Sequence, residues 1–273
     1  MTGERLRFTI LGCGSSPGVP RIGNDWGACN PENPKNRRRR CSLLVERVSQ
    51  EGITRVLVDT GPDLREQALL AGIATVDGVL YTHPHADHIH GIDDLRGFAF
   101  NMRRRVDIYA DDQTMARLKE GFGYCFETPR GSDYPPILNA HSINPGRPLV
   151  VDGAGGPVEA LPFTQQHGAI DSLGFLFGGV AYSPDLNALD ETASELLRGI
   201  DVWIVDALRY TPHPSHLSVD EALGWIAALK PKKAILTHMH VDLDYDALAA
   251  GLPDDVIPAY DLLQFEMPVV SRS

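Results

Sequence analysis

The sequence has few cysteines and no long apolar run. Its 273 residues need no disulfide framework to support a core, and no Cys-x-x-Cys spacing occurs among Cys13, Cys29, Cys41 and Cys125. We therefore expect reduced thiols and a cytoplasmic location. No segment approaches the roughly 18 apolar residues that a membrane span requires. Residues 1–6 lack the apolar core of a secretory signal, so we expect no membrane association.

Basic residues are also fewer than acidic residues. The chain has 25 Lys and Arg against 36 Asp and Glu, a formal net charge of −11. Nucleic acids and membrane surfaces need a basic field for most of their affinity, so both are disfavoured as partners. An anionic substrate must then be attracted locally, by metal ions or nearby arginines. With 43% hydrophobic residues, the chain can form one large core, and we expect a single domain over residues 1-273.

A histidine-rich segment carries the first indication of chemistry. The apolar run 78–81 is typical of a buried strand, and His83 and His85 follow it two residues apart, so an extended backbone points both rings the same way. Asp87 and His88 come next, as the chain turns toward a short helix. An isolated histidine is usually a core or surface residue. Three imidazoles and a carboxylate in six residues instead favour a hydrolytic site with zinc, manganese or iron.

The spacing His-x-His-x-Asp-His of residues 83–88 resembles the signature of the metallo-β-lactamase superfamily of metallohydrolases. The resemblance covers nearly the whole chain and points to the PhnP-type branch, the cyclic phosphodiesterase of the carbon-phosphorus lyase pathway and its relatives. The other segments that carry it are LGCGSSPGVP (11–20), NPKNRRRRCS (33–42), DTGPD (59–63) and LTHM (236–239). It implies an α/β fold, the αββα sandwich, in which two mixed β-sheets pack face to face with helices on both outer faces.

The resemblance also implies a ligand set for two divalent metal ions, manganese or zinc. The ligands are His83, His85 and His167 for one ion, Asp87, His88 and His238 for the other, and Asp185 for both. Asp59 is expected to orient a ligand histidine, because a carboxylate that accepts a ring N–H fixes the tautomer. We expect His216 and Asp87 to take part in catalysis. His216 lies just before a helix that Ser218 and Glu221 begin with a capping box.

The loop 21–36 departs from the pattern of the relatives that carry a structural zinc. Those relatives use Cys-x-Cys-x-x-Cys in this loop and a histidine shortly after the last ligand histidine. The corresponding run here is NDWGAC (24–29), and Val241 stands where that histidine would be. Because Cys29 alone remains of four ligands, a closed tetrahedral site cannot form, and we predict no structural zinc in this loop.

Arginines are the candidates for contact with a phosphate. The run 37–40 directly precedes a predicted strand beside the metals, although a run of four arginines is as often a solvated face. We take Arg39, Arg40 and Arg96 as candidate substrate-binding residues. The acids beside Arg96 could equally begin a helix. The glycines of the loop 12–14 match neither a Walker A motif nor a dinucleotide-binding fingerprint, and a structural turn is the better interpretation.

Periodicity predicts the remaining elements. The expected strands are 6–11, 55–59, 106–110, 158–163, 202–206 and 234–237, with a hairpin formed by 174–177 and 180–183. The expected helices are 63–71, 111–121, 191–199 and 218–229. We expect residues 122–148 to form a long loop, and no catalytic role for Cys125 or His141.

These observations predict a phosphodiesterase with two metal ions. Two cations about 3.5–4 Å apart lower the pKa of a bridging water, and His216 as general acid would protonate the leaving oxygen. The resemblance implies 5-phosphoribosyl 1,2-cyclic phosphate, or a related cyclic or nucleotide-like phosphodiester, as the ligand. The alternatives are a tRNA 3′-processing endonuclease of the same superfamily and a metal-dependent nucleotide-binding regulator. The subunit number stays open, with a homodimer among the alternatives.

Overall fold

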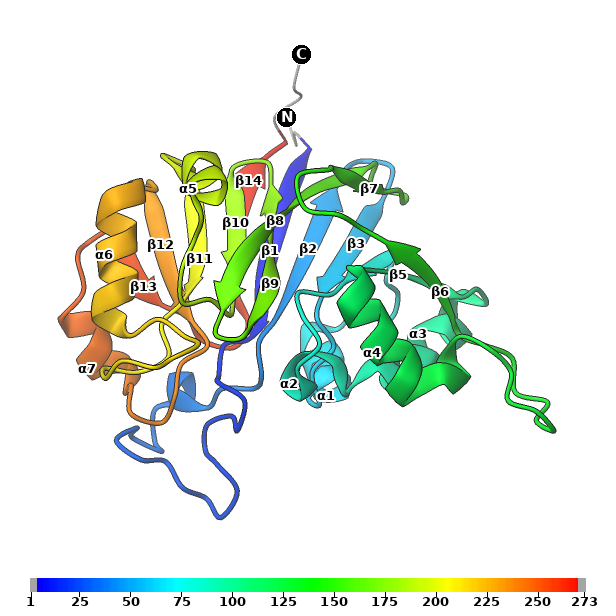
Figure 1. Ribbon diagram of the computed structural model, residues 1–273, viewed down its shortest axis with the longest axis horizontal. Helices are drawn as coiled ribbons and strands as arrows, with labels where there is room; N and C mark the ends of the chain where they lie inside the picture. Colours follow the sequence, from blue (N-terminus) through cyan, green and yellow to red (C-terminus); the bar gives the residue numbers. More distant parts are fainter. Residues whose placement is uncertain (1–3, 270–273) are drawn as a thin grey trace. The chain divides into compact units, whose positions relative to one another are not determined.

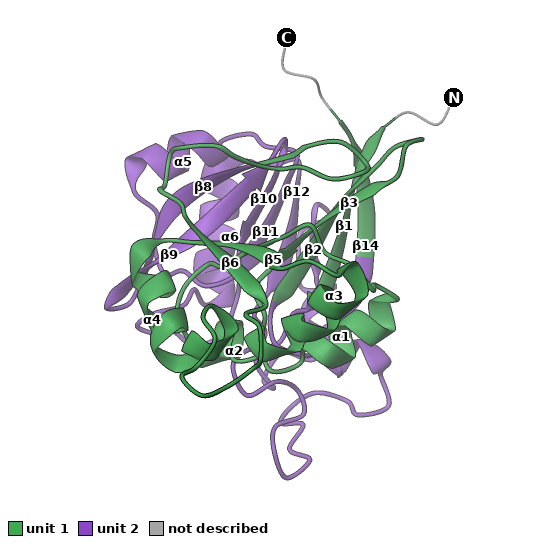
Figure 2. Ribbon diagram, turned by 90° about the vertical axis from the view of Figure 1, so that its right-hand side faces the viewer, with its two compact units in different colours: residues 1–11, 42–159, 264–273 green, residues 12–41, 160–263 purple. Residues whose placement is uncertain are grey.

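The computed structural model describes residues 4–269, so residues 1–3 and 270–273 of the expected domain 1-273 lie outside the described part (Figure 1). The chain forms two compact units, each built from segments that are distant in sequence (Figure 2). Unit 1 consists of residues 1–11, 42–159 and 264–273, and unit 2 of residues 12–41 and 160–263. The expectation of a single domain stays a prediction, and the two units are described separately.

The sheet of unit 1 has seven strands in the order β14-β1-β2-β3-β4-β5-β6. Their bounds are β14 (Leu263–Pro268), β1 (Arg5–Gly12), β2 (Ser42–Val48), β3 (Ile53–Val58), β4 (Gly78–Leu80), β5 (Val106–Ala110) and β6 (Leu138–Ser142). Strands β2 and β3 are antiparallel, whereas β3 to β6 run parallel, so the sheet is mixed.

Four α-helices accompany this sheet: α1 (Leu64–Ala71), α2 (Ala86–Ile89), α3 (Leu95–Met102) and α4 (Asp112–Phe122). Their apolar faces share one buried cluster with the central strands, in which Leu57, Val79 and Ile108 from the sheet join Leu64 and Leu95 from the helices. Asp111 caps α4 as predicted, because its side chain accepts the N–H of Thr114 at 2.7 Å. The short strand β4 is therefore fixed on both edges and by the helix layer.

The second sheet also has seven strands, in the order β13-β12-β11-β10-β9-β8-β7. Their bounds are β13 (Val256–Pro258), β12 (Lys233–Thr237), β11 (Val202–Asp206), β10 (Val180–Ser183), β9 (Ile170–Phe177), β8 (Val158–His167) and β7 (Leu149–Val151). Strands β10 to β13 are parallel, and β8, β9 and β10 are antiparallel neighbours. The predicted hairpin turns between β9 and β10, where Phe177 pairs with Val180.

Unit 2 contains the helices α5 (Glu191–Leu197), α6 (Val219–Leu229) and α7 (Tyr245–Ala250) and a short 3₁₀ helix (Pro34–Asn36). The capping box predicted for α6 is confirmed: the Ser218 hydroxyl accepts the Glu221 N–H, and Glu221 accepts the Ser218 N–H at 2.8 Å. None of the helices in residues 4–269 has the length and apolar character that crossing a membrane requires.

The predicted fold class is confirmed as two mixed seven-stranded sheets with helices. The long loop expected over 122–148 is wrong in part, because residues 138–142 form β6. That strand exposes its side chains over most of its length and owes its conformation to parallel pairing with β5, a long-range contact that periodicity does not report. Strand β8 is also longer than predicted and carries His167 as its last residue.

Candidate metal centre

In unit 1, the predicted site residues come from the carboxyl ends of two neighbouring parallel strands. Val58 of β3 pairs with Leu80 of β4, so Asp59 and the segment from Thr82 to His83 leave the sheet at the same edge. The chain then enters α2, and the residues of its first turn include Asp87 and His88. A single sheet edge therefore gathers one carboxylate and the start of the histidine motif.

Asp59 is the centre of the hydrogen-bond network at this edge. Its Oδ2 accepts the Nδ1–H of His88 at 2.7 Å and the Thr82 hydroxyl at 2.8 Å, and its Oδ1 accepts the Thr82 backbone N–H at 2.8 Å. The Thr82 hydroxyl also lies 2.9 Å from Nδ1 of His83. Burial raises the pKa of the Asp59 carboxyl, and the charge and hydrogen bond of His88 oppose that rise. Because its Nδ1 faces Asp59, His88 presents Nε2 as its other ring atom.

Backbone strain accompanies this position. Asp59 is fully buried and has φ of 63°, a left-handed conformation that residues other than glycine adopt infrequently. The next turn packs closely as well: Gly91 donates its N–H to the Thr60 carbonyl at 2.7 Å, and a Cβ at Gly91 would lie 2.1 Å from the Gly61 carbonyl oxygen. The segment after α2 is therefore locked onto the segment that carries Asp59.

The rings of the motif face one another within unit 1. Nε2 of His83 lies 3.0 Å from Nδ1 of His85, and the ring centroids of His83 and His88 are 4.3 Å apart. Nε2 of His88 lies 3.5 Å from Oδ2 of Asp87. Two imidazole nitrogens bound to one zinc at about 2.0–2.1 Å would be about 3.3 Å apart, close to the observed spacing of His83 and His85. The donor set of this unit fits a divalent cation.

In unit 2, the same arrangement recurs at the carboxyl edge of three parallel strands. Asp185 follows β10, Asp206 ends β11 and His238 follows β12, and the register places Asp206 opposite Thr237. His167 joins them from the end of β8. His238 shares with Asp59 a buried position and a positive φ, here 57°. The shared features mark both positions as ones that local sequence preference alone would not select.

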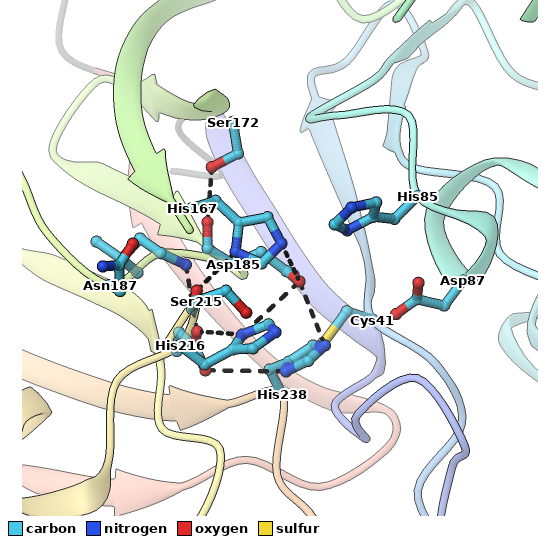
Figure 3. A network of polar contacts seen from close by, with 12 residues as sticks. Cys41, His85, Asp87, His167, Ser172, Asp185, Asn187, Ser215, His216 and His238 are labelled. Atoms are coloured by element: carbon cyan, nitrogen blue, oxygen red, sulfur yellow. Dashed lines mark hydrogen bonds and ion pairs between the residues drawn. The ribbon is translucent and has the colours of Figure 1, made fainter. Parts of the chain in front are cut away.

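Asp185 contacts three imidazoles. Its Oδ2 lies 3.4 Å from Nε2 of His238, 3.8 Å from Nε2 of His167 and 3.9 Å from Nδ1 of His216 (Figure 3). The backbone carbonyl of Asp185 accepts the Ser172 hydroxyl at 2.6 Å. A buried carboxylate among several imidazoles is the oxygen and nitrogen donor set that suits zinc and manganese.

Hydrogen bonds orient the histidines of unit 2. Nδ1 of His167 lies 2.7 Å from the Ser215 carbonyl, so it must be the protonated nitrogen, which leaves the lone pair on Nε2. Nδ1 of His216 lies 2.8 Å from Oδ2 of Asp206. The His216 ring stacks on the His238 ring with centroids 4.5 Å apart, and Figure 3 shows these two rings side by side.

Asp206 belongs to the site although sequence reasoning missed it. The sequence predicts a buried strand there and gives Asp206 no role in the site. In the structure its buried carboxylate accepts a hydrogen bond from His216 and lies 3.8 Å from Nδ1 of His238. Burial raises its pKa well above the ordinary value, against the opposing charge of His238. The signal was present, because VWIVD (202–206) ends an apolar strand with an aspartate just as VLVD (56–59) does. Thr82 was missed as well.

The predicted ligands thus form two groups, one in each unit. Unit 1 contains His83, His85, Asp87 and His88, and unit 2 contains His167, Asp185 and His238. Each group is gathered by its own sheet edge and has a buried aspartate that orients a histidine. That the two groups share two ions stays a prediction.

The three candidate arginines differ in their contacts. Arg39 donates from its backbone N–H and its guanidinium to Oδ2 of Asp261, at 2.9 and 3.2 Å. Arg96 donates to Asp93 at 2.7 Å and lies over the Tyr134 ring. Arg40 is partly buried in unit 2, and a Cβ on Gly18 would lie 3.4 Å from it. Substrate binding by any of the three stays a prediction.

Comparison with known proteins connects these groups to a family. Residues 54–239 match the β-lactamase superfamily domain. A solved structure described as a new diphosphatase from the PhnP family is 36% identical with a TM-score of 0.86, and the match covers 96% of this chain and 97% of that one. These findings agree with the motifs in the sequence.

Two curated proteins are also similar. A Porphyromonas gingivalis protein named octanoyltransferase is 33% identical over 264 residues, which are 95% of this chain and 51% of that protein. A ribonuclease Z from Bradyrhizobium sp. is 30% identical over 153 residues, 53% of this chain and 46% of that protein. The chain spans about half the length of the curated relatives it matches.

Proposed function

Because the chain belongs to the β-lactamase superfamily and, within it, to the PhnP family, we propose that it is a metal-dependent hydrolase of small phosphodiesters. The substrates that we favour are cyclic or nucleotide-like phosphodiesters such as 5-phosphoribosyl 1,2-cyclic phosphate. The observation that carries the proposal lies in unit 2, where Asp206 holds His216 at 2.8 Å beside three predicted ligands. That arrangement suits proton transfer to a leaving group.

The residues proposed to hold two divalent ions, manganese or zinc, are His83, His85, Asp87, His88, His167, Asp185 and His238. Bound ions would supply Lewis acidity and lower the pKa of a water molecule, which makes it a nucleophile near neutral pH. Asp59 keeps Nε2 of His88 available by accepting its Nδ1–H. The Asp87 carboxylate, 3.5 Å from His88, can also accept a hydrogen bond from a water and orient it.

His216 is the proposed general acid. Its Nδ1 faces Asp206, so Nε2 is the ring atom that can carry a proton to the leaving alkoxide of the diester. When Asp206 is ionised, its charge favours the imidazolium before the transfer, and its hydrogen bond keeps the ring in one orientation afterwards. Without this proton, the diester would have to expel a strongly basic alkoxide.

We propose that the contact with the phosphate comes from Arg39, Arg40 or Arg96. Arg39 and Arg40 lie in the segment NPKNRRRRCS, which carries the family resemblance and ends where β2 begins. The Arg39 guanidinium donates to Asp261 and Arg96 donates to Asp93, so either contact with a phosphate would compete with a carboxylate.

A tRNA-processing ribonuclease is the second candidate, since the Bradyrhizobium ribonuclease Z shares 30% identity with part of the chain. The net charge of −11 opposes it, because tRNA binding depends on basic contacts with phosphates.

An acyltransferase, the activity in the name of the P. gingivalis protein, has less support. Burial raises the pKa of Cys13, Cys29 and Cys125, so these thiols are poor acyl acceptors near neutral pH. A nucleotide-binding regulator would bind without turnover.

The proposal is tested with purified protein loaded in turn with manganese and zinc. We expect turnover of bis(p-nitrophenyl) phosphate, and faster turnover of cyclic ribose phosphates or nucleotide-like diphosphates than of pre-tRNA. His216→Ala should keep its metal content and lose about 10²–10⁴ in kcat, whereas Asp185→Ala should lose metal. Binding of nucleotides without turnover would favour the regulator, and preferred cleavage of pre-tRNA would favour the ribonuclease.

The net charge and the buried thiols also bear on the partners and the location of the protein. We propose a small phosphodiester or nucleotide-like ligand, no nucleic acid, and a cytoplasmic location in which the buried thiols of Cys13, Cys29 and Cys125 stay reduced. Light scattering of the purified protein would determine whether it is a homodimer.

A further inference from the structure

A buried arginine occupies the junction between the loop 21–36 and the segment that follows His238. The side chain of Arg38 is almost fully buried, with 1% of its surface exposed. Its guanidinium donates to the Leu243 carbonyl at 2.6 Å, the His240 carbonyl at 3.3 Å and the Asn36 side-chain oxygen at 3.3 Å. The Cys29 sulfur lies 3.9 Å from the same guanidinium. All the acceptors in these contacts are uncharged.

Other contacts join the same two segments around Arg38. The Cys29 thiol donates to the carbonyls of Val241 and Leu243, at 3.3 and 3.4 Å, and the Ala28 N–H donates to the Val241 carbonyl at 2.9 Å. Cys29 and Val241 also belong to one small apolar cluster. The carbonyls of residues 240, 241 and 243 therefore accept hydrogen bonds from Ala28 and Cys29 of the loop and from the Arg38 guanidinium.

The backbone is shaped to admit this side chain. Arg38 exchanges two backbone hydrogen bonds with Val19, each of 2.9 Å. A Cβ at Gly14 would lie 2.9 Å from both the Cβ and the carbonyl oxygen of Arg38, so glycine is needed at that position. Gly14 in turn forms a bridge with Met239, the residue after His238.

These residues do not fit a structural zinc. Zinc needs four ligands with cysteines as thiolates, but Cys29 is the single cysteine here and burial raises its pKa. Its thiol donates to carbonyls instead, and a permanent cation already lies beside its sulfur.

We propose that the Arg38 guanidinium serves as a built-in cation that fastens segment 240–243 to the loop 21–36, and that through this segment it positions His238. Arg38 does not touch the reacting atoms, so it is a positioning residue. The part of the proposal that concerns His238 as a metal ligand rests on the proposed function. The fastening of the two segments does not.

Arg38→Ala is the direct test, with Arg37→Ala as the matched control. Arg37 is the neighbouring arginine, but it is exposed and lies over the Trp26 ring. We expect Arg38→Ala to lower Tm by about 5–10 °C, because it leaves several buried acceptors without donors. It should also weaken manganese binding about tenfold, the usual result of removing support behind a metal ligand. Arg37→Ala should change neither quantity.

Chemical rescue separates the guanidinium from general packing. Millimolar methylguanidinium should restore part of the lost Tm and manganese affinity in Arg38→Ala and have no effect on Arg37→Ala. Arg38→Lys keeps a charge without the planar fork and should remain impaired. Wild-type values of Tm and affinity in Arg38→Ala would overturn the proposal. A Tm deficit that methylguanidinium leaves unchanged would overturn the role of the cation.

Metal content of the wild-type protein gives a test that needs no folded Arg38 variant. If the Arg38 guanidinium occupies the position beside Cys29 where a structural zinc would otherwise lie, Cys29→Ser should bind as many zinc ions per chain as the wild type. One zinc fewer in Cys29→Ser would overturn the proposal. Failure of the proposed function would look different, because Arg38→Ala would still lower Tm while no phosphodiester was hydrolysed by any variant.

Discussion

His216 donates from Nδ1 to Oδ2 of Asp206 over 2.8 Å, and the same carboxylate oxygen accepts the backbone N–H of Leu186 at 3.2 Å. One carboxylate oxygen thus accepts hydrogen bonds both from the chain just after β10 and from the imidazole. In unit 1, Oδ2 of Asp59 likewise accepts a hydrogen bond from Nδ1 of His88 at 2.7 Å. Each unit ends an apolar strand with an aspartate that orients a histidine, one a proposed general acid and the other a proposed ligand.

Asp206→Asn should reduce kcat about 10²–10⁴-fold with metal content unchanged, because the amide can no longer favour the imidazolium or fix the Nδ1–H tautomer. The variant is nearly isosteric, so the fold should be retained. The measurement is kcat against pH with bis(p-nitrophenyl) phosphate, together with metal analysis.

Two comparisons make this prediction specific. Asp206→Asn combined with His216→Ala should be no slower than His216→Ala alone, since both remove one function. Loss of metal in Asp206→Asn would contradict the assignment, because it would show that Asp206 acts mainly through His238, 3.8 Å away.

Asp59→Asn should weaken metal binding about 10–100-fold through loss of the carboxylate behind His88. Asparagine tolerates positive φ, so this variant preserves the strained backbone and changes only the charge. Asp59→Ala removes the side chain and also adds strain, and it should lower the free energy of unfolding further. Calorimetric titration of metal-free protein with manganese measures the first effect. Equal affinity in Asp59→Asn and wild type would show that the His88 tautomer needs no carboxylate.

The motif 83–88 at the end of an apolar strand made part of the site predictable, and the resemblance to the superfamily implied the rest. The motif 83–88 has dense donors at fixed spacing, and the structure places its rings together within unit 1. The family resemblance supplied His167, Asp185 and His238. The last two lie within two residues of the end of a predicted strand, and parallel register brings them to one edge of the sheet. His167 lies four residues beyond the predicted strand 158–163, because β8 is longer than predicted. The ends of strands can be predicted from the sequence because the apolar periodicity stops there.

What escaped prediction depends on contacts between distant segments. Asp206 is an acid at the end of a strand, but its partner His216 lies ten residues on, in a loop whose path the sequence does not reveal. Strand β6 exists because β5 lies beside it. Arg38 belongs to a run of four arginines, a pattern typical of a solvated face. It is buried because its guanidinium donates to the carbonyls of residues 240 and 243.

Gly91→Ala should destabilise unit 1 by about 2–4 kcal/mol, since its Cβ would lie 2.1 Å from the Gly61 carbonyl oxygen and neither backbone can move freely. Gly97→Ala is the matched control. Gly97 lies within α3, and a Cβ there would meet no heavy atom within 4 Å beyond the backbone of its own helix and its chain neighbours. Alanine should therefore stabilise the helix by about 0.5–1 kcal/mol. Urea unfolding of the two variants measures both values.

The sign difference between these two variants is the test. If both are stabilising, the contact between Gly91 and the segment 60–61 is looser than the distance implies, and the segment after α2 does not lock Asp59. If Gly91→Ala is destabilising but binds metal normally, the contact supports folding without positioning the ligands. We expect weakened metal binding, because the Gly91 N–H holds the Thr60 carbonyl directly after Asp59.

Asp261 should make the protein less stable as the pH rises. Burial raises its pKa from 3.8 to about 6, although Arg39 opposes the rise through a backbone hydrogen bond and its charge. The folded state therefore binds a proton that the unfolded state has released. This contribution is fully present below about pH 4, and it is lost as the pH rises through about 6. The difference between the two pKa values corresponds to about 3 kcal/mol.

The measurement compares wild type with Asp261→Asn by urea unfolding of metal-free protein across this pH range. Relative to the variant, the wild type should lose up to about 3 kcal/mol between pH 4 and pH 7. Asp25→Asn is the control with the opposite sign, because hydrogen bonds from Gly27 and Arg21 lower the pKa of the exposed Asp25 carboxyl. Its side chain stabilises the folded state only above its ordinary pKa. A pH-independent difference between wild type and Asp261→Asn would mean that Arg39 holds the Asp261 carboxylate ionised throughout.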